Sequence, residues 1–120
     1  MTDTFCQRLR DSNRRRDHEW RGLDPVSLSF RVLELAAEVG ELASEIKRLE
    51  RDRYGMAGGS VDTTNLAAEV ADVLISLDSL AMDLHVDLAI ATPIKFNATS
   101  VRYGLQAMFA GTTGEPYGAL

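Results

Sequence analysis

Two stretches of the chain repeat apolar residues at the three- and four-residue spacing of amphipathic helices, and this pattern constrains the fold more than any other feature. The first set is Leu28, Val32, Leu35, Val39, Leu42, Ile46 and Leu49, and the second is Leu66, Val70, Val73, Leu77, Leu80 and Leu84. No strand-like alternation of useful length appears. A chain of 120 residues provides one domain and not two independent cores. The sequence therefore predicts an all-α fold in a single domain.

Helix-terminating residues set the expected bounds of these two segments. Asp24 offers an N-cap acceptor and Pro25 suits the first helical position, so the first helix is expected to begin there. It is expected to end near Tyr54, before a glycine-rich break. Asp62 or a following threonine is expected to cap the second helix, which should end near His85.

Shorter segments flank the two long helices. Asp87 is expected to cap a third helix that ends near Tyr103 at Gly104, and Pro93 should either kink it or mark where the regular helix begins. Residues 1–23 are arginine-rich and are expected to form a short helix followed by an irregular segment. The helical domain is thus predicted over residues 1–104, with a loose tail over 105–120.

Charge is distributed unevenly along the chain. The formal net charge of −5 argues against a nucleic-acid binder, which normally presents a basic face. Residues 54–94 contain six acids and no lysine or arginine. The single cysteine, Cys6, cannot form an internal disulfide, no stretch can span a bilayer, and no signal-peptide pattern is present. These features predict a cytoplasmic protein without a membrane partner.

The two helical segments share a local repeat that places acids three residues apart. Residues 35–42 read LAAEVGEL and residues 66–73 read LAAEVADV. Glu38 and Glu41 therefore lie at the same offset from the first apolar face as Glu69 and Asp72 do from the second. If the apolar faces pack together, the four carboxylates can converge on one side of the seam.

An exposed acidic face is the alternative interpretation of this pattern, but such a face normally interleaves bases at helical spacing. Glu34 with Glu38, and Glu41 with Glu45, are instead like-charge pairs four residues apart, which are unfavourable. A divalent cation between the helices would neutralise them. Carboxylate ligands without histidine or cysteine favour Mg²⁺, or alternatively Mn²⁺, over zinc.

The order of these motifs resembles the MazG-like all-α nucleoside triphosphate pyrophosphohydrolases. The resemblance rests on Glu-x-x-Glu followed about thirty residues later by Glu-x-x-Asp. It continues in the segments 19–20, 85–88, 95–97 and 102–104 and covers roughly residues 14–104. The family differs in having paired acids before the first ligand, where this chain has Ala37 before Glu38. Pro93 is also unusual in a segment that the family keeps helical.

The resemblance implies an enzyme that hydrolyses a nucleoside triphosphate to the monophosphate and pyrophosphate, with a role in nucleotide-pool sanitation. It implies a bundle of two long antiparallel helices with shorter flanking helices, completed by assembly into a homodimer or a dimer of dimers. It also implies that four carboxylates hold Mg²⁺: Glu38, Glu41, Glu69 and Asp72. Glu45 would be a further ligand or would orient the attacking water as a catalytic residue.

The candidate substrate-binding residues lie on both sides of the acidic segments. Lys95 and Arg102 are seven residues apart and share a helical face, so both can reach one phosphate chain. Ordinary surface cations are the alternative for this pair. The neighbouring candidates from the same motifs are Asn97 and Tyr103, and those from the N-terminal segment are Trp20, to stack on a base, and Arg16, from the run Arg14–Arg16.

Two other functions fit the same sequence. A non-catalytic helical dimer could use the acidic face to bind a basic partner, and a hydrolase of a modified or regulatory nucleotide would share the metal site. The sequence does not distinguish base, sugar, or dimer from tetramer, because pocket shape depends on packing and on a second subunit.

Overall fold

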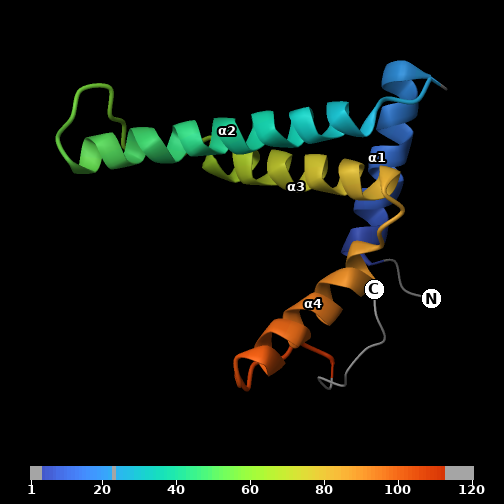
Figure 1. Cartoon of the computed structure of the whole chain (residues 1–120). Helices are drawn as coiled ribbons and strands as arrows, with labels where there is room; N and C mark the ends of the chain where they lie inside the picture. The colour runs from blue at the N-terminus through green and yellow to red at the C-terminus, as the bar shows by residue number, and fades with distance from the viewer. Residues whose placement is uncertain (1–3, 23, 113–120) are drawn as a thin grey trace.

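The computed structural model describes residues 4–22 and 24–112, and over these residues every regular element is a helix. The elements are α1 (Phe5–Arg21), α2 (Leu28–Arg53), α3 (Leu66–Asp83) and α4 (Leu88–Arg102) (Figure 1). The all-α prediction is confirmed for this part of the chain. The final residues of the predicted tail, 113–120, lie outside the described residues.

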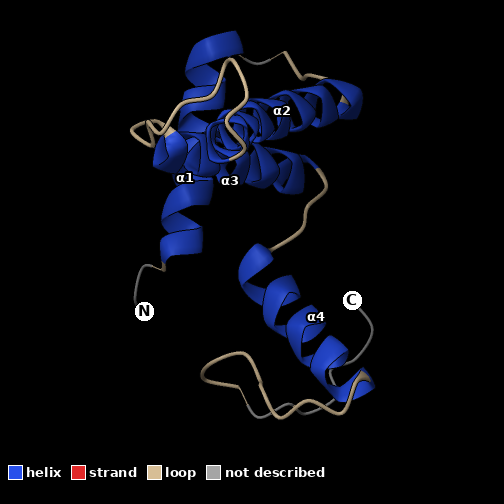
Figure 2. Ribbon diagram, turned by 90° about the vertical axis from the view of Figure 1, so that its left-hand side faces the viewer, coloured by secondary structure: helices blue, strands red, loops and turns tan. Residues whose placement is uncertain are grey.

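The longest helices, α2 and α3, lie side by side and run in opposite directions, and α1 crosses them at one end (Figures 1 and 2). The loop that joins α2 to α3 lies at the far end of the pair, so the acidic segments of both helices face each other between this loop and α1. The expected antiparallel arrangement of the two long helices is therefore present.

The N-terminal segment is more regular than the sequence predicted. A single 17-residue helix replaces the expected short helix and irregular stretch. The Thr4 side chain accepts the Gln7 backbone N–H, while the Gln7 side chain accepts the Thr4 backbone N–H at 3.1 Å in each case. This capping box satisfies backbone donors at the start of the helix, which extends the helix toward the N-terminus.

The expected starts of the two long helices were wrong by a few residues. Ser27 caps α2 in place of Asp24, because its hydroxyl accepts a backbone N–H of the first turn at 3.1 Å. Asn65 precedes α3, whereas Asp62 accepts the Thr64 backbone N–H at 2.9 Å within the preceding loop. Asp and Ser both cap helices well, so sequence alone left the choice between neighbouring acceptors undecided.

Helix α4 begins and ends where the sequence predicted. The Asp87 carboxylate accepts the Ala89 N–H at 2.9 Å, and Gly104 follows the helix with φ of 67°. Pro93 lies inside the helix, which continues on both sides of it. Helix α4 extends away from the α2–α3 pair in both views (Figures 1 and 2).

The described part of the predicted tail is fastened to α4 and is not loose. The Asn97 side-chain amide accepts the Phe109 N–H at 2.7 Å and donates to the Thr112 hydroxyl at 2.8 Å. The rings of Phe96 and Phe109 meet edge to face with their centroids 6.0 Å apart. This small contact closes the C-terminal end of α4.

The single chain buries little apolar surface. Among the described residues, Ala81 is the one apolar side chain in the buried class, while five buried residues are polar: Asn13, Arg31, Asp78, Asn97 and Ser100. The accessible surface is 8946 Å², against about 6,400 Å² expected for a compact monomer of 13.2 kDa. The radius of gyration is 18.0 Å, against about 14 Å for a compact chain of this length.

Within the described residues, no helix has the length and apolar character needed to cross a membrane.

Candidate functional site

A buried carboxylate fixes α1 across α3. The Asp78 side chain is 1% exposed and accepts hydrogen bonds from Arg10 Nε at 3.1 Å and from Asn13 Nδ2 at 3.0 Å. Arg10 also donates to the Val86 carbonyl at 2.8 Å, and Asn13 donates to the Ile75 carbonyl at 3.1 Å. Because each buried polar group has partners, the crossing of α1 over α3 is held in one geometry.

A second ionic network joins α1, α2 and α3, and we call it the Arg31 cluster: Arg31, Asp17, Asp83, Arg21 and Glu34. Arg31 is 4% exposed and lies 2.7 Å from Asp83, 2.9 Å from Asp17 and 3.5 Å from Glu34. Arg21 pairs with Asp17 at 2.5 Å. Burial raises the pKa of Asp17, but hydrogen bonds from Arg21 and Arg31 and their charges outweigh it, so the net pKa is lowered. Burial similarly opposes the charge on Arg31, yet its bonds to Asp83 and Asp17 leave its pKa raised.

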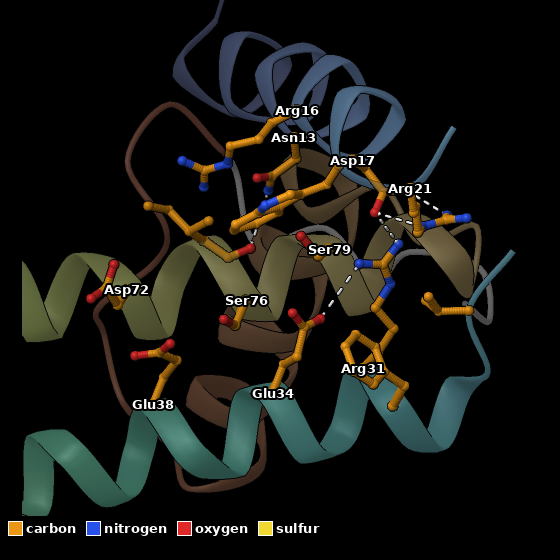
Figure 3. A pocket seen from close by; sticks show the side chains of 14 residues that line it. Asn13, Arg16, Asp17, Arg21, Arg31, Glu34, Glu38, Asp72, Ser76 and Ser79 are labelled. Atoms are coloured by element: carbon orange, nitrogen blue, oxygen red, sulfur yellow. Dashed lines mark hydrogen bonds and ion pairs between the residues drawn. The ribbon is translucent and has the colours of Figure 1, made fainter. Parts of the chain in front are cut away.

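A cavity of about 490 Å³ lies between the three helices, beside the Arg31 cluster (Figure 3). Trp20 and Arg16 of α1 contribute to its lining, together with Ser76 of α3. Glu38 of α2 and Asp72 of α3 also line it (Figure 3). Cavities of this size accommodate small molecules in other proteins.

The four predicted metal ligands lie along the α2–α3 seam, and we call them the carboxylate cluster: Glu38, Glu41, Glu69 and Asp72. One carboxylate oxygen from each of Glu38, Glu41 and Glu69 lies within 4.8 Å of the others. Asp72 is outside that group of three, but its charge acts on both Glu38 and Glu69. The structure thus brings together three of the predicted ligands and places the fourth beside them.

The electrostatics of the carboxylate cluster are unfavourable as it stands. Partial burial raises the pKa of Glu38, and the charges of Glu41 and Asp72 raise it further. The pKa of Glu69 is raised in the same way, by burial and then by Glu41. None of the ion pairs among the described residues includes a member of this cluster.

The oxygen atoms of the cluster fit a divalent cation. The Oε2 atoms of Glu38 and Glu69 are buried without a hydrogen-bond partner, so two acceptors converge where no protein donor reaches them. The donors are all carboxylate oxygens, and the nearby side chains add no sulfur or imidazole ligand. Hard oxygen ligands of this kind suit Mg²⁺ or Mn²⁺.

The predicted catalytic residue, Glu45, has a partner of its own. It forms a hydrogen-bonded ion pair with Arg48 one turn further along α2. It is therefore neutralised locally, unlike the four members of the carboxylate cluster. Its predicted role, as a further ligand or as the group that orients water, stays a prediction.

The predicted substrate-binding residues divide into two groups in the structure. Trp20 and Arg16 line the cavity, and the Arg16 guanidinium lies 5.7 Å from the Trp20 ring centroid. Trp20 is 79% exposed on α1, so its ring is open to a ligand and does not close a hydrophobic core.

The other four candidates belong to α4 and its end, and the cavity lining includes none of them. Arg102 lies over the Tyr103 ring at 5.4 Å from the centroid. The Asn97 amide is 2% exposed and is already bonded to the segment after α4, so it is not free to meet a phosphate or a sugar. Lys95 lies on the exposed surface of α4. Within one chain, these residues are not brought to the carboxylate cluster.

Sequence analysis did not identify the Arg31 cluster or the Asp78 network. A usable signal was present, because Asp78 and Asp83 occur in an apolar helix that has no base, so each needs a partner from another segment. Arg10 is the partner of Asp78, and Arg31 is the partner of Asp83. The spacing of single residues did not show which base would pair with which acid.

No protein-family model matches this chain, and comparisons with curated proteins and with solved structures also find no match. The resemblance to the MazG-like family therefore stays a prediction that depends on the sequence motifs alone.

Proposed function

We propose that the protein is a Mg²⁺-dependent nucleoside triphosphate pyrophosphohydrolase, which releases a nucleoside monophosphate and pyrophosphate. The observation that carries the proposal is the carboxylate cluster at the edge of a cavity of about 490 Å³. Three converging carboxylates, with two buried oxygens lacking partners, would be neutralised and satisfied by a divalent cation. A metal site beside a ligand-sized cavity favours binding of a phosphate-containing small molecule over binding of a protein partner.

Glu38, Glu41 and Glu69 would hold the cation, with Asp72 beside them. When bound, Mg²⁺ would neutralise phosphate charge and lower the pKa of a bound water. Water oxygen attacks the α-phosphorus and loses its proton to a carboxylate or to solvent. The bond from the α-phosphorus to the bridging oxygen breaks, and that oxygen leaves with the bonding electrons as part of pyrophosphate.

The cavity suits the nucleoside part of such a substrate. Trp20 presents an exposed ring for a base to stack on, and Arg16 holds a cation above that ring. Glu38 and Asp72 line the cavity where it meets the carboxylate cluster. A base bound near Trp20 would direct its phosphates toward the metal ligands.

Assembly with a second copy of the chain belongs to the same proposal. The excess of surface over a compact monomer is about 2,500 Å² per chain, or about 5,000 Å² for two chains, which is at the upper end of the range of obligate homodimer interfaces. Exposed apolar residues on α4 include Ile90, Phe96 and Val101. In a homodimer or a dimer of dimers, α4 of a partner can carry Lys95 and Arg102 to the carboxylate cluster, which α4 does not reach within one chain.

The test is pyrophosphate release from a panel of ribo- and deoxyribonucleoside triphosphates with Mg²⁺. Glu41→Gln keeps the size of the side chain and removes a ligand charge, so we expect activity to fall by at least about 100-fold. Glu50→Gln is the matched control, because Glu50 lies on the same helix and pairs with Arg53 outside the cluster. Helicity by circular dichroism should be the same in both variants.

Absence of release from every wild-type reaction would instead favour the non-catalytic helical dimer that binds a basic partner. Release from only a modified or regulatory nucleotide would keep the metal site and change the substrate. A positive result in the standard panel supports a role in clearing unwanted nucleotides.

A further inference from the structure

One arginine of α2 lies at the end of the carboxylate cluster that is farther from the cavity. Glu38, Glu41, Glu45 and Arg48 follow at steps of three, four and three residues, so they share one face of α2. Glu38 lines the cavity, Glu41 comes next along the helix, and Arg48 lies beyond Glu45. Cavity, carboxylates and arginine therefore occur in that order along one helix.

The Arg48 side chain is directed back toward the carboxylate cluster. Its backbone lies about 10 Å along the helix axis from that of Glu41. Helical side chains lean toward the N-terminus, and the ion pair with Glu45 shows that Arg48 does so. The guanidinium is thereby held about one helical turn beyond the cluster, and its side chain is 45% exposed.

The surroundings of Arg48 are acidic on more than one side. Its hydrogen bond to Glu45 raises the pKa of the guanidinium, and the charges of Glu45, Asp62 and Glu69 add to this effect. Glu69 belongs to the carboxylate cluster, so the field of Arg48 reaches the candidate metal site. An arginine in this position remains charged at every relevant pH.

The loop after α2 is fixed close to this arginine. The Ser60 backbone N–H donates to the Arg48 carbonyl at 3.1 Å. Gly59 approaches the backbone so closely that a Cβ there would lie 2.4 Å from the Asp52 nitrogen. The close approach permits only glycine, and it fixes the loop that carries Asp62.

We propose that Arg48 binds the diphosphate end of the substrate, which becomes the pyrophosphate leaving group. This inference rests on the proposed function of the carboxylate cluster. A nucleotide with its base in the cavity and its α-phosphate at the cluster extends its β- and γ-phosphates along α2 toward Arg48. A guanidinium matches phosphate oxygens with two parallel hydrogen bonds.

The chemistry of cleavage makes a cation useful at this position. As the α-phosphorus bond to the bridging oxygen breaks, negative charge accumulates on the departing pyrophosphate. Arg48 lies where that charge develops, whereas Lys95 and Arg102 lie on α4, away from the cluster of the same chain. The Arg48 side chain is 45% exposed and the Glu45 side chain 14% exposed, so phosphate would reach Arg48 from its solvent side and displace Glu45 from it. Displacement frees the Glu45 carboxylate beside the reaction site.

The test measures pyrophosphate binding by isothermal titration calorimetry in excess Mg²⁺, beside the kinetics of triphosphate hydrolysis. Arg48→Ala should weaken pyrophosphate binding about 10- to 100-fold, the value of one charge-assisted contact. Arg48→Lys should fall between wild type and Arg48→Ala. Arg53→Ala is the matched control, because Arg53 forms the same kind of pair with Glu50 at the end of the same helix.

Two further measurements separate this role from a purely structural one. Mn²⁺ binding and helicity should be unchanged in Arg48→Ala, or metal binding should tighten because a nearby positive charge is removed. Glu45→Ala should bind pyrophosphate at least as tightly as wild type, because it removes the carboxylate that phosphate displaces from Arg48. Weaker binding in Glu45→Ala would show that Arg48 acts through Glu45.

The outcomes distinguish the two proposals. Equal pyrophosphate affinity in wild type and Arg48→Ala, or no binding to wild type, overturns the role of Arg48 whether or not hydrolysis occurs. Hydrolysis by wild type with that result leaves the proposed function standing. Arg48-dependent pyrophosphate binding without hydrolysis of any nucleotide supports the diphosphate site and refutes the enzyme.

Discussion

Two groups of charged side chains lie next to each other along α2, and they differ in whether the fold supplies basic partners for their carboxylates. In the Arg31 cluster, carboxylates from α1, α2 and α3 surround the buried Arg31 guanidinium at 2.7–3.5 Å, and half-buried Arg21 pairs with one of them. In the carboxylate cluster, two turns further on, Glu38, Glu41 and Glu69 meet without a base, and Asp72 lies beside them. Figure 3 shows Glu38 and Asp72 of this cluster at the cavity. The first group supplies its own counter-charges and holds the helices together. The second has two buried acceptors, on Glu38 and Glu69, without a hydrogen-bond partner among the described residues.

The largest effect is expected from removing the central charge of the Arg31 cluster. Arg31→Gln leaves Asp17 and Asp83 without their shared partner, which for a buried pair costs about 3–5 kcal/mol. Thermal denaturation should show a fall in Tm of roughly 10 °C or more at fixed protein concentration. Lys47→Gln, on the exposed surface of the same helix, should stay within about 0.5 kcal/mol of wild type.

An unchanged Tm in Arg31→Gln would remove the contrast between the two groups, because the Arg31 cluster would then be no more structural than a surface ion pair.

A smaller effect of opposite character is expected at the carboxylate cluster. Mg²⁺ or Mn²⁺ should raise the Tm of wild type. The free energy of unfolding should increase by about 2.7 kcal/mol when the free ion concentration is a hundred times the Kd. Glu41→Gln should lose most of this response and should be at least as stable as wild type in chelator, since a like charge is removed. Glu50→Gln should keep the full response. A destabilised metal-free Glu41→Gln would show that Glu41 is a structural residue.

The contrast also shows which parts of this molecule a single sequence predicts. The two long helices and the end of α4 were predicted from local signals. The helical spacing of apolar residues and the terminating Gly104 are each visible within a few residues of sequence. The same reasoning found Glu38, Glu41 and Glu69, because repeated acids on adjacent helices meet when the helices pack antiparallel. Both inferences needed only helical geometry and the pairing of neighbouring segments.

What the sequence did not predict depends on contacts between distant segments. Arg10 lies 68 positions from Asp78, and Arg31 lies 52 positions from Asp83 and 14 from Asp17. Several arginines of the N-terminal segment compete for such acids. Asn97 fits a phosphate-binding motif by its neighbours, yet it bonds to Phe109 and Thr112. The choice between such uses is made by packing, which one chain's local pattern does not encode.

The smallest effect, and the one that compares the two groups most directly, is their opposite response to pH. The pKa of Asp17 is lowered from 3.8, so the stability it contributes is present above that value and is lost as pH falls through the lower folded-state value.

The pKa values of Glu38 and Glu69 are raised from 4.5 by burial and by neighbouring acids. The folded state then binds more protons than the unfolded state, and these residues destabilise the protein as pH rises from 4.5 through their folded-state values. In chelator, Tm should therefore decline as pH rises from about 4.5 through the raised folded-state pKa values of Glu38 and Glu69, and level off above them. With saturating Mg²⁺ that decline should disappear, because the cation and the protons compete for the same oxygens and metal binding strengthens as the carboxylates ionise. Thermal scans from pH 3 to 8, with and without Mg²⁺, measure two limbs of the Tm curve: the loss at low pH from Asp17 and the decline above about pH 4.5 from Glu38 and Glu69. Glu41→Gln should flatten the limb at higher pH alone. If the two limbs moved together in this variant, the groups would be electrostatically one site and the division between a structural and a ligand-binding cluster would be wrong.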